Sequence, residues 1–160
     1  QSMKQQQFTL THVEATDEYV LQLAFADGFR AGVCLAEPIR RHRSLRSLLD
    51  PQIFRRVRPD CWNLGVIFND DDDLSLASDS LRAWAIEQAG GFSHLQVMAW
   101  MAYHGLTLDA AALALGVSRR MLAYYRSGRR PIPRPIGLAM VGWGIVETRG
   151  VGAVLHYDAA

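Results

Sequence analysis

The feature that most constrains the fold is a segment in which two short helices are predicted with only a tight turn between them. Thr107 is suited to cap the first helix, in which apolar residues recur at helical spacing: Leu108, Ala111, Ala112 and Leu115. Gly116 permits a sharp turn, and Ser118 can cap a second helix that continues to Ser127 and ends at Gly128. Because alanine side chains are small, the second helix can cross the first closely.

The second helix is predicted to have two distinct faces. On a wheel of about 100° per residue, Leu122 and Tyr125 point toward the core, with Met121 beside them. A band of about 140° on the other side carries donors and small side chains, namely Arg119, Arg120, Ala123, Tyr124 and Ser127. Arginines can bridge the O6 and N7 atoms of guanine or hold phosphates, and a tyrosine can contact a phosphate or a thymine methyl. This band therefore indicates a helix that reads a DNA groove.

The charge distribution supports a polyanionic partner for the second half of the chain. Residues 1–90 carry 10 Lys and Arg against 13 Asp and Glu, a net charge of −3, whereas residues 91–160 carry 7 against 3, a net charge of +4. No acidic residue lies between Asp109 and Glu147. The same segment contains six arginines: Arg119, Arg120, Arg126, Arg129, Arg130 and Arg134. Such a local excess of positive charge is typical of a nucleic-acid-binding surface.

Two further helices are predicted on either side of this pair. Ser93 and Gln96 form a capping-box pattern before a helix that runs to about His104. After a proline-rich stretch, a last helix is predicted from about Arg134 to Glu147. Its apolar residues, Ile136, Met140 and Trp143, are expected to close the helical core.

The segment from Thr107 to Pro133, TLDAAALALGVSRRMLAYYRSGRRPIP, resembles the helix-turn-helix of the lambda-repressor and Cro-like regulators. The matching features are the mid-helix alanine at Ala111 or Ala112, the turn Leu115–Ser118, Leu122, Tyr125, and Gly128 followed by a basic pair and proline. The resemblance implies a bacterial transcription regulator in which Arg119 and Arg120 meet base edges, with Ala123 and Tyr124 one turn further on. Arg126 stands where the family commonly has Glu, and adds positive charge near the DNA backbone.

The predicted function is therefore sequence-specific binding of double-stranded DNA. The predicted DNA-binding residues are Thr107, Ser118, Arg119, Arg120, Ala123, Tyr124, Arg126, Ser127, Arg129 and Arg130. We expect a homodimer, because one short helix reads only a few base pairs and paired half-sites raise affinity and specificity. We expect the N-terminal unit to supply part of the dimer contact through Trp62, Leu64 and Phe68. A unit of this size cannot easily bury so many large apolar side chains by itself.

The N-terminal half is predicted to form a strand meander followed by short helices and strands. The expected strands are Thr9–Glu14, Tyr19–Phe25, Arg30–Leu35, Leu64–Phe68 and Leu74–Leu76, and a helix from Asp79 to Gln88 is expected with Ser78 as its N-cap. A basic run from Arg40 to Arg46 enters a short helix; we interpret it as a solvated face, with nucleic-acid binding as the alternative.

The predicted fold class is α+β, with a small β-meander and helix domain at residues 4–90 and an all-α helix-turn-helix domain at residues 91–150. The N-terminal half resembles a family of small bacterial domains through Asp50–Phe54, Gly65–Phe68 and Asp73-Leu74. Some members of that family are encoded beside small toxin-like proteins. The alternative function is therefore a protein-binding module, such as the antitoxin of a toxin-antitoxin pair.

Other function classes find little support in the sequence. The histidines (His12, His42, His94, His104 and His156) are scattered, and no HExxH or GxSxG motif occurs, so we expect no enzyme. Asp70–Asp73 lack the spacing of a calcium loop and are expected to form a solvated connection, so no metal or other cofactor is predicted. Cys34 and Cys61 have neither CxxC nor zinc-finger spacing and are expected to be reduced and structural.

No membrane association is predicted. The sequence has no apolar run of about 20 residues that could cross a bilayer, and its N-terminus lacks the pattern of a secretory signal. We therefore expect a cytoplasmic protein whose partners are double-stranded DNA and a second copy of the chain, with a further protein partner as the alternative.

Overall fold

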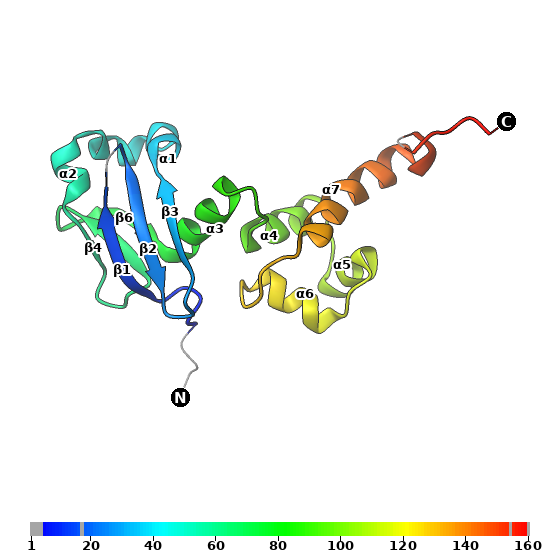
Figure 1. Cartoon of the computed structure of the whole chain (residues 1–160), viewed down its shortest axis with the longest axis horizontal. Coiled ribbons are helices and arrows are strands. Elements are labelled where there is room, and N and C mark those ends of the chain that lie inside the picture. Colours follow the sequence, from blue (N-terminus) through cyan, green and yellow to red (C-terminus); the bar gives the residue numbers. More distant parts are fainter. Residues whose placement is uncertain (1–4, 17, 154, 160) are drawn as a thin grey trace. The chain divides into compact units, whose positions relative to one another are not determined.

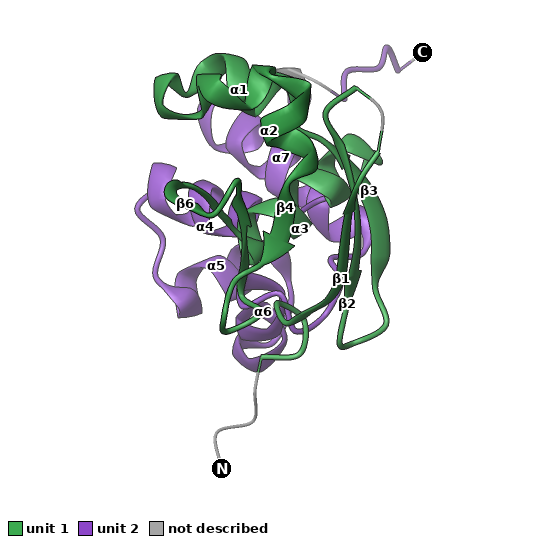
Figure 2. Ribbon diagram, turned by 90° about the vertical axis from the view of Figure 1, so that its left-hand side faces the viewer, with its two compact units in different colours: residues 1–90 green, residues 91–160 purple. Residues whose placement is uncertain are grey.

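The chain is organised as two compact units, residues 1–90 and 91–160 (Figures 1 and 2). The computed structural model describes residues 5–16, 18–153 and 155–159, so the predicted start of the first domain at residue 4 lies outside the described residues. Among the helices that these residues form, none is both long and apolar enough to cross a membrane.

The first unit begins with a three-stranded antiparallel sheet in the order β1-β2-β3. Its strands are β1 (Leu10–Ala15), β2 (Val20–Phe25) and β3 (Arg30–Cys34). The central strand β2 supplies most of the buried side chains of this sheet, including Leu21, Leu23 and Phe25. Gly28 has a φ of +93° in the turn between β2 and β3, a conformation that glycine adopts without strain.

A second three-stranded antiparallel sheet follows in the order β4-β5-β6. Its strands are β4 (Val57–Pro59), β5 (Gly65–Phe68) and β6 (Asp71–Ala77). Gly65 lies so close to β6 that a Cβ atom on it would come within 2.8 Å of the Leu76 carbonyl oxygen. A glycine at this position therefore allows the two strands to approach.

The helices of the first unit pack with both sheets around one hydrophobic core. They are α1 (Ala36–Arg41), the 3₁₀-helix η1 (Arg43–Leu49), α2 (Pro51–Arg55) and α3 (Ser78–Gln88). The core contains Leu21, Leu35, Ile39, Leu48, Phe54, Val66, Phe68 and Leu81. The expectation that Ser78 caps α3 is wrong: Ala77 is the N-cap residue, and the Ser78 hydroxyl donates to the Phe8 carbonyl oxygen.

The second unit consists of four α-helices and a short 3₁₀-turn. They are α4 (His94–Tyr103), α5 (Leu108–Leu115), α6 (Arg119–Arg126), α7 (Arg134–Arg149) and η2 (Val151–Ala153). Val97, Ala111, Leu122 and Met140 bring α4, α5, α6 and α7 into one core. The predicted capping box of Ser93 and Gln96 is confirmed, because each side chain bonds the backbone N–H of the other residue.

The predicted fold class, an N-terminal meander followed by an all-α helix-turn-helix domain, is contradicted by the structure. The chain is mixed α+β, because β4 pairs with β5 and β5 with β6 to give a second antiparallel sheet in addition to the expected meander. The backbone of Asp71–Asp73, expected to form a solvated connection, is the start of β6. The C-terminal region is helical, but it does not form a clear helix-turn-helix domain of the predicted kind. Its last helix, α7, reaches Arg149 and leaves Leu138 and Val141 more than half exposed, so it is only partly covered by the other helices.

Two further expectations require correction. Phe68 is fully buried, so it cannot contribute to a contact with a second chain. Cys34 and Cys61, expected to be structural, are both exposed, so neither is a core residue. The described residues contain no group of three His, Cys, Asp or Glu side chains arranged to hold a metal ion.

Candidate nucleic-acid interface

Helices α5 and α6 are joined by a three-residue connection whose backbone is fixed at both ends. The Thr107 hydroxyl accepts a hydrogen bond of 3.1 Å from the Ala110 N–H, and the Ser118 hydroxyl accepts one of 3.1 Å from the Met121 N–H. Gly116 lies in the left-handed region with φ +68°, and so ends α5 without strain. These contacts confirm the predicted caps and set the point at which α6 begins.

Helix α6 is held to the second unit by one face. Leu122 is fully buried and Tyr125 is 7% exposed, and Met121 packs against the same core. The surrounding buried side chains include Val97 and Trp100 of α4. Because these contacts occupy only the inner face, the side chains on the outer face remain available to a partner.

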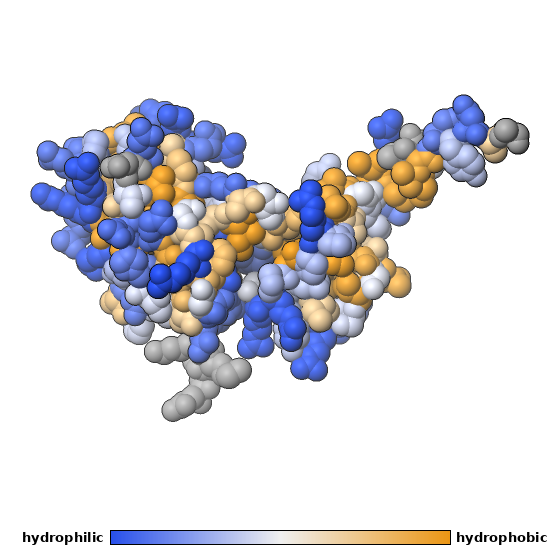
Figure 3. Space-filling view, in the orientation of Figure 1, coloured by the Kyte–Doolittle hydropathy of each residue, from blue (hydrophilic) through white to orange (hydrophobic). Residues whose placement is uncertain are grey.

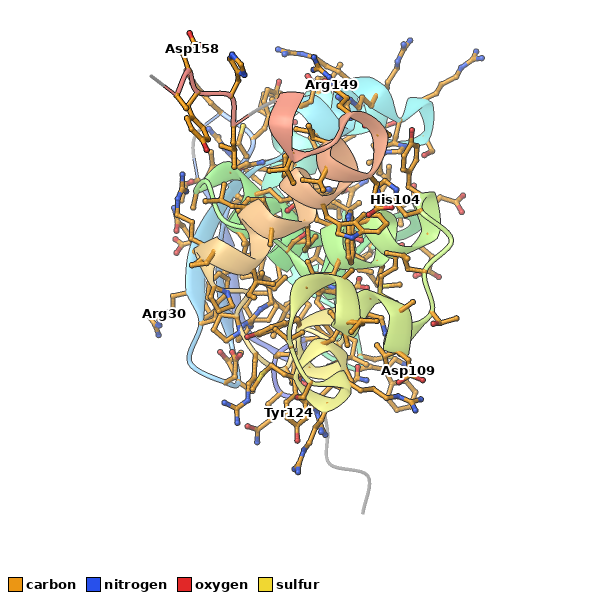
Figure 4. All side chains as sticks on the ribbon, turned by 90° about the vertical axis from the view of Figure 1, so that its right-hand side faces the viewer. Arg30, His104, Asp109, Tyr124, Arg149 and Asp158 are labelled. Atoms are coloured by element: carbon orange, nitrogen blue, oxygen red, sulfur yellow. The ribbon has the colours of Figure 1, made fainter. Side chains whose placement is uncertain are left out.

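The outer face of α6 begins with Arg119 and Arg120, both exposed, and continues with the half-buried Ala123 and Tyr124. The Arg120 Nε–H donates a hydrogen bond of 2.8 Å to the Tyr124 hydroxyl one turn later. Figure 4 shows Tyr124 among the side chains that project from α6. This hydrogen bond restricts the rotamers of Arg120, so less conformational entropy is lost when its guanidinium meets a ligand.

Tyr124 also organises the chain that follows α6. Its carbonyl oxygen accepts hydrogen bonds from the N–H groups of Arg129 at 3.0 Å and Arg130 at 3.3 Å. The guanidinium carbons of Arg120 and Arg130 lie 5.6 Å and 5.4 Å from the centre of its ring, within the range of cation–π attraction. One tyrosine thus gathers arginines from the first turn of α6 and from the segment after it.

The same arginines change the acidity of the Tyr124 hydroxyl. The hydrogen bond from Arg120 lowers the pKa of Tyr124 below its ordinary value, and the positive charges of Arg120, Arg129 and Arg130 act in the same direction. We expect Arg120→Ala to raise this pKa toward the ordinary value of about 10, because the main stabilisation of the phenolate is lost. Ring carbon shifts of labelled tyrosine, followed against pH, measure it.

Arg126→Ala is the matched control for this titration, because Arg126 is also on α6 but is not among the causes of the shift. It should leave the Tyr124 pKa unchanged. An unchanged Tyr124 pKa in Arg120→Ala would show that the hydrogen bond does not persist in solution.

Arg119 has a partner that the sequence analysis did not identify. Its Nε lies 3.5 Å from a carboxylate oxygen of Asp109 in the first turn of α5, and both side chains are largely exposed. An exposed ion pair of this kind contributes only about 0–1 kcal/mol. A well-formed bidentate contact between arginine and guanine contributes about 1–3 kcal/mol, so Arg119 can exchange Asp109 for a base at little cost.

A comparison with solved structures gives a strong match. It is the crystal structure of a "Putative DNA Binding Protein" from Nitrosomonas europaea, with 36% sequence identity and a TM-score of 0.79 over 95% of this chain and 96% of that chain. The chain belongs to the same family. Comparisons with protein-family models and with curated proteins give no match. Because the match covers 95% of the chain, the two family members share both units.

In this chain, most of the predicted site residues lie together on or next to α6. Arg119, Arg120, Arg126, Arg129 and Arg130 are all exposed. The hydroxyls of Thr107 and Ser118 cap helices, and the Ser127 hydroxyl donates to the Tyr124 carbonyl oxygen at 3.2 Å. The pairing of Arg120 with Tyr124 was not predicted, although their i, i+4 spacing on a helix is the signal that could have identified it.

Proposed function

We propose that this chain binds double-stranded DNA through the outer face of α6 and the arginines that follow it, and that it regulates transcription. The observation that carries the proposal is the arrangement of Arg119, Arg120 and Tyr124 on an exposed helix face, with no acidic residue between Asp109 and Glu147. The description of the Nitrosomonas protein as DNA binding supports the same function.

The two groups of arginines are suited to different parts of a duplex. Arg119 and Arg120 stand on the first turn of α6, where a helix inserted into the major groove meets base edges. Arg126, Arg129 and Arg130 lie at and beyond the end of α6, where a sugar-phosphate backbone is the nearer neighbour. The first group therefore supplies specificity, and the second supplies affinity that depends on salt concentration.

Selection from a random pool of duplexes tests the proposal. The full chain, purified free of nucleic acid, should enrich a common sequence, and its affinity for that duplex should fall linearly on a plot of log K against log salt concentration. Failure to enrich any sequence, together with binding that does not depend on salt, would contradict the proposal.

We further propose that the DNA-binding form is a homodimer. Exposed apolar side chains are concentrated in the last part of the second unit: Leu138, Val141, Ile145 and Val146 on α7, followed by Val151, Leu155 and Tyr157. Figure 3 shows this hydrophobic surface along α7. A contiguous exposed apolar surface is commonly an interaction site, and its lack of charge allows an identical surface to pack on it. A dimer carries two α6 helices, and regulators that bind as dimers read paired half-sites about 34–36 Å apart.

Light scattering at micromolar concentration should give twice the chain mass of 17.9 kDa. Val141→Asp should shift the mass toward that of one chain, because it places a charge in the contact. Leu113→Asp is the matched control: Leu113 is 85% exposed on α5, so this variant should stay dimeric. A parent protein that scatters as a single chain, with selected sites that are not palindromic, would contradict the homodimer.

A further inference from the structure

A second basic surface lies on the first unit. That unit is acidic overall, yet residues 40–46 contain four arginines and no acidic residue. Arg41 pairs with Glu37 through a 3.0 Å contact. The exposed Arg40, Arg43 and Arg46 form no ion pair with any described residue, and we call these three the α1–η1 arginine row.

The 3₁₀ geometry of η1 aligns part of this row. A 3₁₀-helix has three residues per turn, so side chains three apart lie directly above one another. Leu45 and Leu48 therefore both point into the core, where they are 5% and 0% exposed. By the same spacing Arg43 and Arg46 share an outer face, about 6 Å apart along the axis at the usual rise of this helix.

The backbone that carries the row is held firmly. Ile39 of α1 and Leu48 of η1 are fully buried in the core of the first unit. The Tyr19 hydroxyl donates a 2.8 Å hydrogen bond to the Leu49 carbonyl oxygen, and the Asp50 side chain accepts from the Gln52 N–H to begin the next helix. The arginines thus project from a fixed support, and only their own side chains need to be ordered on binding.

The chemistry of the row fits phosphate groups of a nucleic-acid duplex. Each strand of B-DNA presents a phosphate every 3.4 Å along the axis, so guanidinium groups on flexible side chains about 6 Å apart can reach neighbouring phosphates. Residues 36–49 contain no Phe, Tyr or Trp on which unpaired bases could stack, which disfavours single-stranded nucleic acid. Their only largely exposed apolar side chain is Leu49, at 43%, which disfavours a membrane surface.

We propose that the α1–η1 arginine row is a second, sequence-independent phosphate-binding surface, which adds affinity for duplex beyond the site that α6 reads. This inference rests on the proposed function, because the duplex is taken to be the ligand of the same chain. Two linked contacts on one duplex strengthen binding by raising the effective concentration of the second contact after the first has formed.

The test compares two duplexes that contain the same selected site, one without flanking sequence and one extended by roughly 20 base pairs on each side. For the long duplex, a plot of log K against log salt concentration should be less steep for Arg43→Ala/Arg46→Ala than for the parent, by about 2 in the magnitude of the slope. The affinity ratio of parent to variant should accordingly change by about tenfold between 50 and 200 mM salt. On the short duplex the variant should bind like the parent.

Arg30→Ala/Arg149→Ala is the matched control, because it removes the same charge from two exposed positions outside both surfaces. If the two double variants bind the long duplex alike, the row is not a phosphate-binding surface. A loss confined to single-stranded RNA or to vesicles containing phosphatidylserine would equally overturn the proposal.

The two proposals can fail separately. If Arg119→Ala/Arg120→Ala abolishes sequence preference but Arg43→Ala/Arg46→Ala binds like its control, the proposed function of α6 is supported and the proposal for the α1–η1 arginine row is contradicted. If the parent protein shows no sequence preference, yet Arg43→Ala/Arg46→Ala binds the long duplex more weakly than the parent, the proposal for the row is supported and the proposed function of α6 is contradicted.

Discussion

The double variant Arg119→Ala/Arg120→Ala is expected to lose most of its preference for the selected duplex. Each arginine is expected to contribute about 1–3 kcal/mol of specific binding, which corresponds to roughly a 5- to 150-fold change in affinity. In the parent protein, Arg119 must give up its ion pair with Asp109 in order to bind a base, and the variant has no such pair to break. This difference offsets little of the expected loss of affinity, because the ion pair is exposed and therefore weak. Binding to unrelated duplexes should fall much less, since the arginines beyond α6 remain.

Competition between the selected and an unrelated duplex measures this effect, and Arg30→Ala/Arg149→Ala again supplies a charge-matched control. Figure 4 labels both control positions, on β3 and at the end of α7. Both double variants should unfold like the parent, because all four arginines are exposed. If both also retain the specificity of the parent, α6 is not the helix that reads the bases.

The largest effect on stability is expected for Leu122→Ala. Leu122 is fully buried beneath the outer face of α6, in a core shared with α4, α5 and α7. Replacing such a leucine removes its burial free energy and leaves a cavity, at a cost of about 2–5 kcal/mol. Urea unfolding of the full chain should show this as a lower midpoint for the transition of the second unit.

Leu113→Ala is the control for this experiment, because Leu113 is 85% exposed on the neighbouring helix α5. Its effect should stay within about 0.5 kcal/mol. If Leu122→Ala changes the free energy of unfolding by as little, α6 is not held to the core through Leu122. The outer face of α6 would then lack the fixed position inferred from that contact.

The local structure of the second unit could be predicted because its signals lie within four residues of one another. The caps formed by Ser93, Thr107 and Ser118 each join a side chain to a backbone N–H three residues later. Gly116 and Gly128 have the positive φ values that their places at helix ends indicated. The inner and outer faces of α6 follow from helical spacing alone.

The features that the sequence analysis missed depend on contacts between distant segments. Four consecutive aspartates indicate a solvated connection, but Asp71–Asp73 are the start of β6, in which Asp71 pairs with Phe68 of β5. Ser78 has the composition of an N-cap, yet its hydroxyl bonds Phe8, which is seventy residues away in the chain. The exposed apolar face of α7 could not be recognised because burial depends on which helices pack against it.

Nuclear magnetic resonance of the labelled full chain, titrated with the selected duplex, shows directly whether α6 is the helix that contacts DNA. The largest amide shifts are expected between Ser118 and Arg130, and the Tyr124 ring resonances should move with them, because the proposed binding mode brings these groups against the DNA. Specific binding that leaves these amides and the Tyr124 ring unchanged, with shifts confined to the first unit, would contradict it.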